Sequence, residues 1–265
     1  MKFIFLIAMI LGTTAASANS LEYSDRFEDA EEFNTPTVED LAVEAAETSS
    51  ATGNEVNSWS YVFTLIKPNG KQVPLSEHNR HAMLKPASTI KLFTAYWAFK
   101  NKTQSHTFLG KMLKTSDNDM AQATLNELGD PSDMRQYYEN LGLPVEAFYP
   151  VDGSGLDYAN GSSCDFQIAF LSLVRRSQGY QTFRNLLAQP GALGTLENRL
   201  KELRGLVYAK TGTLNRTSNL SGFIETKKGT VIFCVVGDYL RTSSASARQK
   251  IDEMVRMNIN KVNGR

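Results

Sequence analysis

Apolar residues follow one another almost without interruption from position 90 to position 99, where only Lys91 and Thr94 are clearly polar. A helix that is apolar on nearly every side is buried in a protein core. Pro86 stands just before this run, and proline suits the first turn of a helix, where its missing N–H costs nothing. The pattern therefore predicts a buried helix that begins close to Ser88.

Shorter segments rich in aromatic and β-branched residues predict five strands. Residues 58–65 and 71–75 flank the pair Asn69-Gly70, which is typical of a tight hairpin turn. Three more strands are predicted near the C-terminus, at residues 205–213, 219–226 and 230–237. The last of these is almost continuously apolar, which indicates a central strand. The five strands can form one antiparallel sheet only if the two ends of the chain come together.

Helical patterns fill the chain between these two groups of strands. Helices are predicted at residues 105–114, 120–128, 131–141, 166–175, 180–188 and 195–203, with an amphipathic helix at 246–259 near the C-terminus. The fold class predicted is α/β (α+β), with a five-stranded antiparallel sheet flanked by terminal helices and an all-helical lobe at about residues 100–200. We expect the functional groups to lie in the cleft between the two lobes.

The first 18 residues have the organisation of a secretory signal peptide. Lys2 is followed by an apolar run at residues 3–11 and by the small-residue sequence Ala16-Ser17-Ala18. An uncleaved anchor is the alternative, but the apolar run is short for crossing a bilayer. The sequence therefore predicts an exported protein of the periplasm or cell envelope, with no stable membrane insertion after cleavage.

Charge divides the chain into an acidic leader, residues 19–56, and a basic body. The leader holds eleven acidic residues and one basic residue, while the formal net charge of the whole chain is zero, so the body is basic by about nine charges. We interpret the leader as a solvated spacer. A basic body suits a polyanionic cell envelope or nucleic acid. Because no nucleic-acid motif accompanies it, no nucleic-acid partner is expected.

The chain has two cysteines, Cys164 and Cys234. An exported protein meets an environment in which disulfides persist, but these two residues lie in different kinds of predicted element. The sequence leaves their pairing open, and we favour two free thiols. Neither cysteine has a cysteine or histidine neighbour at the spacing of metal ligands, and the three histidines form no such pattern. No metal and no cofactor is expected.

Ser88 and Lys91 stand three positions apart at the start of the predicted buried helix, so their side chains share one helix face. An amine in apolar surroundings has its charged form disfavoured and can act as a base. A hydroxyl at a helix N-terminus gains from the helix dipole when it becomes an oxyanion. The pair is a candidate activated nucleophile, although the same spacing also fits an ordinary core helix with a polar rim.

Two more short motifs follow in chain order, Ser116-Asp117-Asn118 and Lys210-Thr211-Gly212. Each alone also fits a helix cap or a strand end. Together with Ser88-x-x-Lys91 they resemble the three motifs of the serine penicillin-recognising enzymes. With the surrounding segments 84–95, 152–156 and 209–214, the chain is similar over about residues 57–260 to the class C low-molecular-mass penicillin-binding proteins. These are D-Ala-D-Ala carboxypeptidases and endopeptidases of peptidoglycan with a β-lactamase/DD-peptidase-like fold.

The resemblance implies a role for each matching residue. Ser88 is the nucleophile that becomes acylated, and Lys91 takes its proton. Ser116 relays a proton to the leaving amine, Asn118 orients Lys91 and the substrate amide, and Lys210 holds Ser116. The remaining matches form a substrate-binding set in which the threonines hold the substrate carboxylate and the glycine-rich turn shapes the pocket: Thr211, Gly212, Thr213, Ser154, Gly155 and Leu156.

The chain departs from the class C pattern in two ways. Only 25 positions separate Lys91 from Ser116, so the large domains that the family usually inserts there are missing. Asp157-Tyr158 stands where the family often has Ser-Arg, which indicates relaxed specificity for the substrate side chain. Residues 57–265 are expected to form a single catalytic domain.

The function predicted is that of a serine DD-peptidase of peptidoglycan stem peptides. It would act as carboxypeptidase, DD-endopeptidase or both, with β-lactams as covalent inhibitors. One alternative is a serine β-lactamase, although the chain lacks the Glu-x-x-x-Asn that class A members carry after the second motif. The other is a non-catalytic module that binds peptidoglycan or penicillin.

Overall fold

The computed structural model describes residues 58–264, and the predicted signal peptide and acidic leader lie outside the described residues. Five strands form one antiparallel sheet in the order β2-β1-β7-β6-β5. Their bounds are β1 Ser58–Ile66, β2 Gln72–His78, β5 Val207–Leu214, β6 Thr217–Thr226 and β7 Gly229–Asp238. All five predicted strands are confirmed, and so is the predicted sheet.

The first and the last strand of the described chain pair with each other inside this sheet. Strand β1 pairs with β7 along its whole length, with Phe63 opposite Phe233. Strand β7 is the central strand, and every residue from Thr230 to Asp238 is buried, as its continuous apolar run predicts. Successive side chains of β7 point to opposite faces of the sheet, so Phe233 packs in one hydrophobic cluster and Cys234 in another.

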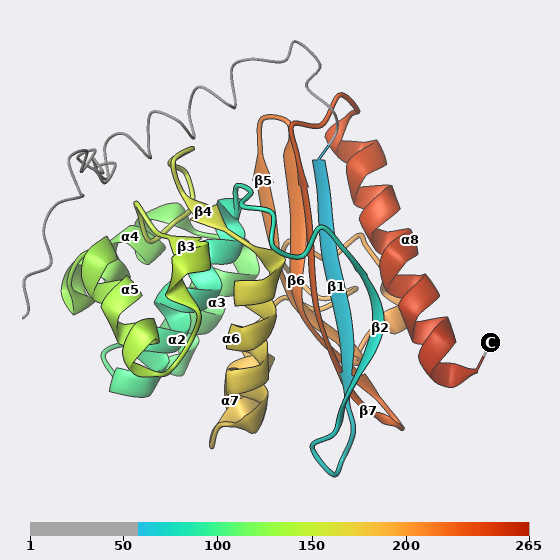
Figure 1. Ribbon diagram of the computed structural model, residues 1–265. Coiled ribbons are helices and arrows are strands. Elements are labelled where there is room, and N and C mark those ends of the chain that lie inside the picture. The colour runs from blue at the N-terminus through green and yellow to red at the C-terminus, as the bar shows by residue number, and fades with distance from the viewer. Residues whose placement is uncertain (1–57, 265) are drawn as a thin grey trace, which may run out of the picture. The chain divides into compact units, whose positions relative to one another are not determined.

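One helix covers one face of the sheet, and the helical lobe lies on the other side (Figure 1). Helix α8, Ser244–Asn263, packs with Ile251 and Val255 in the same cluster as Phe233. Helix α6, Cys164–Arg176, lies against β7 and β1 on the opposite face. The other helices are α2 Lys91–Asn101, α3 His106–Thr115, α4 Asn118–Leu128, α5 Pro131–Asn140 and α7 Tyr180–Asn185. The predicted mixed α and β fold with a five-stranded antiparallel sheet is confirmed. The lobe is mainly helical, but it also holds a two-stranded antiparallel sheet of β3 Phe148–Tyr149 and β4 Gly161–Ser162, which the sequence did not predict.

Helix α2 is the buried helix that the apolar run predicts, since its side chains from Lys91 to Ala98 are all buried. The ring of Phe93 lies at centroid distances of 4.7–5.9 Å from four other aromatic rings, those of Tyr138, Phe148, Phe166 and Phe170. Aromatic pairs of this kind add about 0.5–1.5 kcal/mol each beyond the area they bury. The helix that follows Ser88 is therefore fixed in the centre of the lobe.

The helix predicted at residues 195–203 is wrong. The structure has turns there and only a short 3-10 helix, η3 Lys201–Leu203. Leu196 and Leu200 are buried at helical spacing, which explains the expectation, but Leu200 has a left-handed φ of 50°. The Thr195 N–H is also used by another element, because it donates to the Lys114 carbonyl at 3.0 Å. These contacts hold the segment in turns instead of a regular helix.

The preference for free thiols is also wrong, because Cys164 and Cys234 form a disulfide. Cys164 is the first residue of α6, and Cys234 lies in the middle of β7. The register of the strand directs Cys234 toward the face on which α6 packs, and the two Cα atoms are 5.5 Å apart. The disulfide joins the helical lobe to the central strand. The difference between the two kinds of element, on which the expectation rested, is no obstacle once they are packed face to face.

Candidate active site

The Ser88–Lys91 pair lies at the junction of a 3-10 turn, η1 Ala87–Ile90, with α2. A 3-10 turn has three residues per turn, so side chains three positions apart lie directly above one another. The Lys91 Nζ atom is accordingly 3.0 Å from the Ser88 Oγ atom. It also donates to Asn118 Oδ1 at 2.7 Å and to the Ser154 carbonyl oxygen. The local helix geometry therefore places the amine against the hydroxyl.

Burial of the Lys91 ammonium lowers its pKa to about 8, and the carboxylates of Asp152 and Asp117 partly offset this effect. The side chain has no exposed surface, so water cannot stabilise the charged form. A pKa near 8 leaves a usable fraction of Lys91 neutral at neutral pH. A neutral amine at hydrogen-bond distance from a hydroxyl is the arrangement of a general base beside a nucleophile.

The second motif lies in the tight connection between α3 and α4. Ser116 ends α3 in a left-handed conformation with φ 61°, and the Asp117 side chain caps α4 by accepting from the Met120 N–H at 2.9 Å. Asn118 is the first residue of α4. These two caps turn the chain sharply. The turn directs Asn118 toward Lys91 and Ser116 toward Lys210. These residues can therefore cap the helices and also contribute to a functional site.

Lys210, on strand β5, is fully buried. Its Nζ atom donates to Ser116 Oγ at 2.7 Å and to the Thr211 carbonyl at 2.8 Å. Burial lowers the pKa of Lys210 well below its ordinary value, and the nearby charge of Lys91 lowers it further. The second and third motifs are therefore in direct contact, and both buried lysines lie in one electrostatic neighbourhood.

The glycine-rich turn 152–156 approaches the nucleophile from the lobe. The Asp152 carboxylate accepts from the N–H groups of Ser154 and Asp157, each at 2.7 Å, and from that of Gly155. Burial of this carboxyl raises its pKa, but these hydrogen bonds outweigh burial and hold the pKa below its ordinary value. The charged carboxylate fixes the turn, which presents the Ser154 carbonyl to Lys91. Leu156, the last residue of the turn, is exposed.

Two glycines allow the turn and strand β5 to approach the chain around Ser88. A Cβ atom on Gly155 would overlap the Ala87 carbonyl oxygen, and one on Gly212 would lie 2.8 Å from the Pro86 carbonyl oxygen. Beside Gly212, Thr211 is largely buried and Thr213 is exposed. The structure thus brings the third motif and the glycine-rich turn against the residues that precede Ser88, while the second motif contacts Lys91 and Lys210.

Two polar residues that no sequence motif marks hold the chain just before Ser88. The Asp238 carboxylate accepts from the Lys85 N–H at 3.2 Å and pairs with Lys85 Nζ at 3.3 Å. The Asn219 amide donates to the carbonyls of Lys85 and Pro86 at 2.9 and 2.8 Å. Each residue ends or interrupts an apolar strand pattern, but no short spacing joins it to Ser88. Only the sheet topology brings these residues together.

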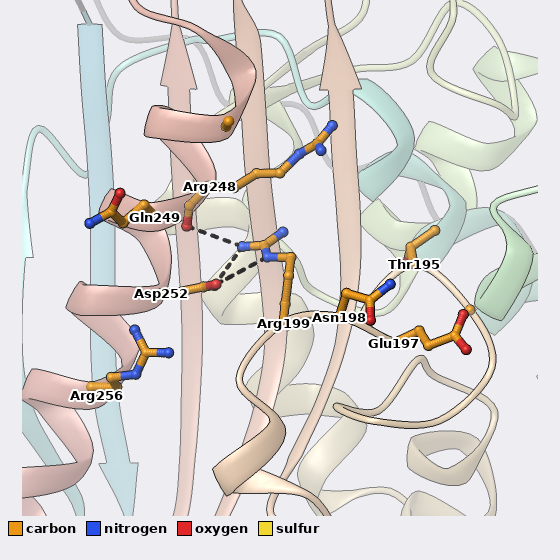
Figure 2. Close-up of a pocket in the computed structure, with 10 residues that line it drawn as sticks. Thr195, Glu197, Asn198, Arg199, Arg248, Gln249, Asp252 and Arg256 are labelled. Carbon is orange, nitrogen blue, oxygen red and sulfur yellow. Dashed lines mark hydrogen bonds and ion pairs between the residues drawn. The ribbon is translucent and has the colours of Figure 1, made fainter.

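A separate cavity of about 540 Å³ lies between α8 and the segment 194–199 (Figure 2). Two of its arginines are held in ion pairs, Arg199 with Asp252 of the lining at 2.7 Å and Arg256 with Glu202, which lies outside the lining, at 2.6 Å. It contains no residue of the three motifs. This cavity is therefore not the candidate active site.

Within residues 58–264, no group of three or more histidine, cysteine, aspartate or glutamate side chains is placed to hold a metal ion. No helix in this part of the chain is long and apolar enough to cross a membrane.

Comparison with known families matches residues 103–261 to the D-Ala-D-Ala carboxypeptidase 3 (S13) family. This match includes the second and third motifs and begins after Lys91. A D-alanyl-D-alanine carboxypeptidase of Actinomadura sp. (strain R39) is 31% identical over 105 residues, which are 37% of this chain. The aligned part spans about a fifth of that protein, 20% of its length.

Similar solved structures share the fold at low sequence identity. A β-lactamase from Sphaerobacter thermophilus has a TM-score of 0.60 at 16% identity, covering 84% of this chain and 96% of its own. Penicillin-binding protein D2 from Listeria monocytogenes, in its cefotaxime-bound form, has a TM-score of 0.60 at 19% identity, covering 76% and 96%. A predatory endopeptidase from Bdellovibrio bacteriovorus has a TM-score of 0.54 at 23% identity, covering 59% and 45%.

The similarity to penicillin-binding proteins with a β-lactamase/DD-peptidase-like fold, expected from the three motifs, is confirmed. The family match covers more than half of the chain, and the chain belongs to the D-Ala-D-Ala carboxypeptidase 3 (S13) family.

Proposed function

We propose that this protein is a serine DD-peptidase that cleaves the D-Ala-D-Ala bond of peptidoglycan stem peptides through an acyl-enzyme on Ser88. The observation that carries the proposal is the distance of 3.0 Å between Lys91 Nζ and Ser88 Oγ. The lowered pKa of Lys91, about 8, supports it, because the neutral amine can accept the hydroxyl proton. Membership of a D-Ala-D-Ala carboxypeptidase family supports the substrate class.

In the acylation step, Lys91 accepts the proton of Ser88 while Ser88 Oγ attacks the carbonyl carbon of the scissile bond. The bond to the leaving amine then breaks, and this nitrogen takes a proton from Ser116 Oγ. Lys210, at 2.7 Å from Ser116 Oγ, supports this transfer because it donates a hydrogen bond to the hydroxyl. Ser116 Oγ regains a proton from the Lys91 ammonium, so both groups return to their starting states. Water then attacks the acyl carbonyl carbon, Lys91 takes a proton from this water and gives it to Ser88 Oγ as the ester bond breaks, and the shortened peptide leaves with Ser88 restored.

The oxyanion of the tetrahedral intermediate would accept hydrogen bonds from the backbone N–H groups of Ser88 and Thr213. Donors of this kind are typically worth about 3–4 kcal/mol in the transition state. Thr211 and Thr213 would hold the terminal carboxylate of the peptide, with Lys210 nearby. Asn118, which accepts from Lys91 at 2.7 Å, would keep the amine directed toward Ser88.

We propose both carboxypeptidase and endopeptidase activity. The support is the short connection between Lys91 and Ser116, which carries no inserted domain. A domain missing at this place leaves more room for cross-linked peptides. The shared fold with a solved endopeptidase is compatible with this activity. Digestion of purified sacculi tests it, since loss of dimeric muropeptides is expected and unchanged dimers would restrict the enzyme to carboxypeptidase activity.

The decisive test of Ser88 is the intact mass of the protein after incubation with benzylpenicillin. We expect a stable penicilloyl adduct on the wild type and on Ser132→Ala, a control at an exposed helix position, but none on Ser88→Ala. Consumption of penicillin without a lasting adduct would indicate a β-lactamase. Binding without acylation or turnover would indicate a non-catalytic module.

We also propose that the protein acts outside the cytoplasm, in the periplasm or cell envelope. The support is the predicted signal peptide, the disulfide between Cys164 and Cys234, and the cell-wall substrate of the family. Cell fractionation tests this location. The N-terminal sequence of the secreted protein should begin at Asn19 if the predicted cleavage site is used.

A further inference from the structure

Lys85 and Pro86, which lie three and two positions before Ser88, are hydrogen-bonded to two side chains from neighbouring strands of the sheet. Asp238 ends β7, and its carboxylate accepts from both the backbone N–H and the Nζ of Lys85. Asn219, on β6, donates to the carbonyls of Lys85 and Pro86. Backbone groups on both sides of the Lys85–Pro86 peptide are thus hydrogen-bonded to side chains of the sheet.

These contacts hold a conformation that the chain does not favour by itself. Ala87 has a left-handed φ of 46°, which is unfavourable for a residue with a Cβ atom. Such a conformation persists only where the surrounding structure determines it. The next residue is Ser88, so a change at Ala87 rotates the nucleophile away from Lys91 Nζ. The direction of Ser88 Oγ therefore depends on how firmly the preceding residues are held.

The Asp238 carboxylate is well suited to this task because it is itself fixed. Its side chain is only 2% exposed. Besides Lys85, it accepts from Thr217 Oγ1 at 2.7 Å and from the Tyr239 N–H at 2.9 Å. The ammonium of Lys85 lies 3.8 Å from the centroid of the Tyr239 ring. A buried carboxylate with this many donors cannot move without losing several of them.

We propose that Asp238 is a positioning residue for the nucleophile. It acts through the Lys85 N–H and, together with Asn219, keeps Ala87 in its left-handed conformation and Ser88 Oγ against Lys91 Nζ. This inference rests on the proposed function in one respect, that Ser88 is the acylated residue. Misplacement of a reacting group by about 1 Å can cost on the order of a hundredfold in rate.

The test is the second-order rate constant of acylation by benzylpenicillin, measured together with the fraction of molecules labelled at saturation. For Asp238→Asn we expect a rate constant at least tenfold lower, with the labelled fraction unchanged. Asn219→Ala, which removes the donor to the other side of the same peptide, should act in the same direction. It serves as the second variant if Asp238→Asn does not fold.

The matched control is Glu225→Gln at the opposite end of the sheet. Glu225 is a partly buried carboxylate that accepts from Arg184 at 2.7 Å and Thr230 at 2.9 Å. This variant should lower Tm while leaving the acylation rate of labelled molecules unchanged. If Asp238→Asn likewise lowers Tm or the labelled fraction but changes the rate less than twofold, Asp238 is merely structural and the proposal is overturned.

Amide hydrogen exchange of the peptide containing residues 84–92 keeps the two proposals separate. Faster exchange there in Asp238→Asn than in Glu225→Gln is expected whether or not the protein reacts with penicillin. An unreactive wild type with this faster exchange would overturn the serine peptidase and leave the restraint by Asp238 standing. A reactive wild type whose rate and exchange are unaffected by Asp238→Asn would overturn the positioning role alone.

Discussion

Lys91 and Lys210 are two buried lysines of one site, and the charge of Lys91 affects the pKa of Lys210. Burial lowers the pKa of Lys210, and the charge of Lys91 lowers it further. Each donates to a serine hydroxyl, Lys91 to Ser88 at 3.0 Å and Lys210 to Ser116 at 2.7 Å. The folded site binds fewer protons than the same residues in the unfolded chain. The protonation of these two lysines and the free energy of unfolding are therefore linked.

The acylation rate should depend on pH through Lys91. Its pKa is lowered to about 8, and only the neutral amine can take the Ser88 proton. We expect the rate constant of acylation by benzylpenicillin to rise about tenfold per pH unit below pH 8 and to level off above it. Time courses of the intact-mass adduct on both sides of pH 8 measure this profile.

Asp152→Asn provides the control for that assignment. The Asp152 carboxylate raises the pKa of Lys91 against the larger effect of burial. Its neutralisation should therefore move the midpoint of the profile to lower pH. A flat profile in the wild type would exclude Lys91 as the base. A midpoint that does not move in Asp152→Asn would assign the observed ionisation to a group other than Lys91.

Replacement of Lys210 should separate stability from activity. The pKa of Lys210 is lowered in the folded state, so its burial destabilises the fold at neutral pH, and this cost disappears as pH rises toward the unfolded pKa. Each unit of lowering corresponds to about 1.4 kcal/mol. We expect Lys210→Met to unfold at higher urea concentration than the wild type at pH 7, with a smaller difference near pH 10, and to lose acylation.

Lys210→Arg is the control for charge, because a guanidinium stays protonated in proteins. A charge that cannot be removed from this fully buried position should make this variant less stable than the wild type at both pH values. If Lys210→Met were instead less stable than the wild type at neutral pH, the hydrogen bonds of Lys210 to Ser116 and Thr211 would outweigh the cost of burying its charge.

Most of the sheet and the centre of the lobe could be predicted, because local patterns determine them. The pair Asn69-Gly70 specifies the hairpin, since Gly70 has the left-handed φ of 81° that the turn requires. The continuous apolar run of β7 specifies its central place. The Ser88–Lys91 contact also follows from spacing alone, because both residues lie on the same helical turn.

The features that could not be predicted depend on contacts between distant segments. Asp238 accepts a hydrogen bond from the Lys85 N–H although the two residues are 153 positions apart, and no short motif joins them. The disulfide depends on which face of β7 meets α6. The segment 195–203 has buried leucines at helical spacing, but the left-handed φ of Leu200 becomes visible only when the segment is packed against its neighbours.

Gly155→Ala should lower both the stability and the acylation rate, and by more than the cost of its backbone conformation alone. Gly155 has φ 83°, which costs an alanine about 1–2 kcal/mol. Its Cβ atom would also overlap the Ala87 carbonyl oxygen, next to the nucleophile. We expect a further loss of about 1–3 kcal/mol in unfolding free energy and at least a tenfold lower acylation rate. Urea unfolding and adduct time courses measure both.

Gly70→Ala is the matched control for that variant. Gly70 has nearly the same φ, 81°, but a Cβ atom there meets nothing within 4 Å. It should lose only the conformational cost of about 1–2 kcal/mol and keep the acylation rate. Equal losses of stability and activity in the two variants would show that the approach of Gly155 to Ala87 has no importance for the site.

Removal of the disulfide should destabilise the protein without abolishing acylation. Cys164 and Cys234 are 70 positions apart, and a cross-link that closes a loop of this length stabilises a fold by about 4 kcal/mol in the chain-entropy model. We therefore expect a loss of about 2–4 kcal/mol in Cys164→Ala/Cys234→Ala by urea unfolding. Neither cysteine belongs to the three motifs, so molecules that remain folded should be acylated at the wild-type rate.

A reducing agent supplies the control for this last prediction. It should lower the unfolding free energy of the wild type toward that of the double variant and leave the double variant unchanged. The disulfide joins α6 to the central strand, so its loss should act first on the attachment of the lobe to the sheet. If a reducing agent destabilised both proteins equally, the effect would not come from this bond, and the stabilisation by the disulfide would be contradicted.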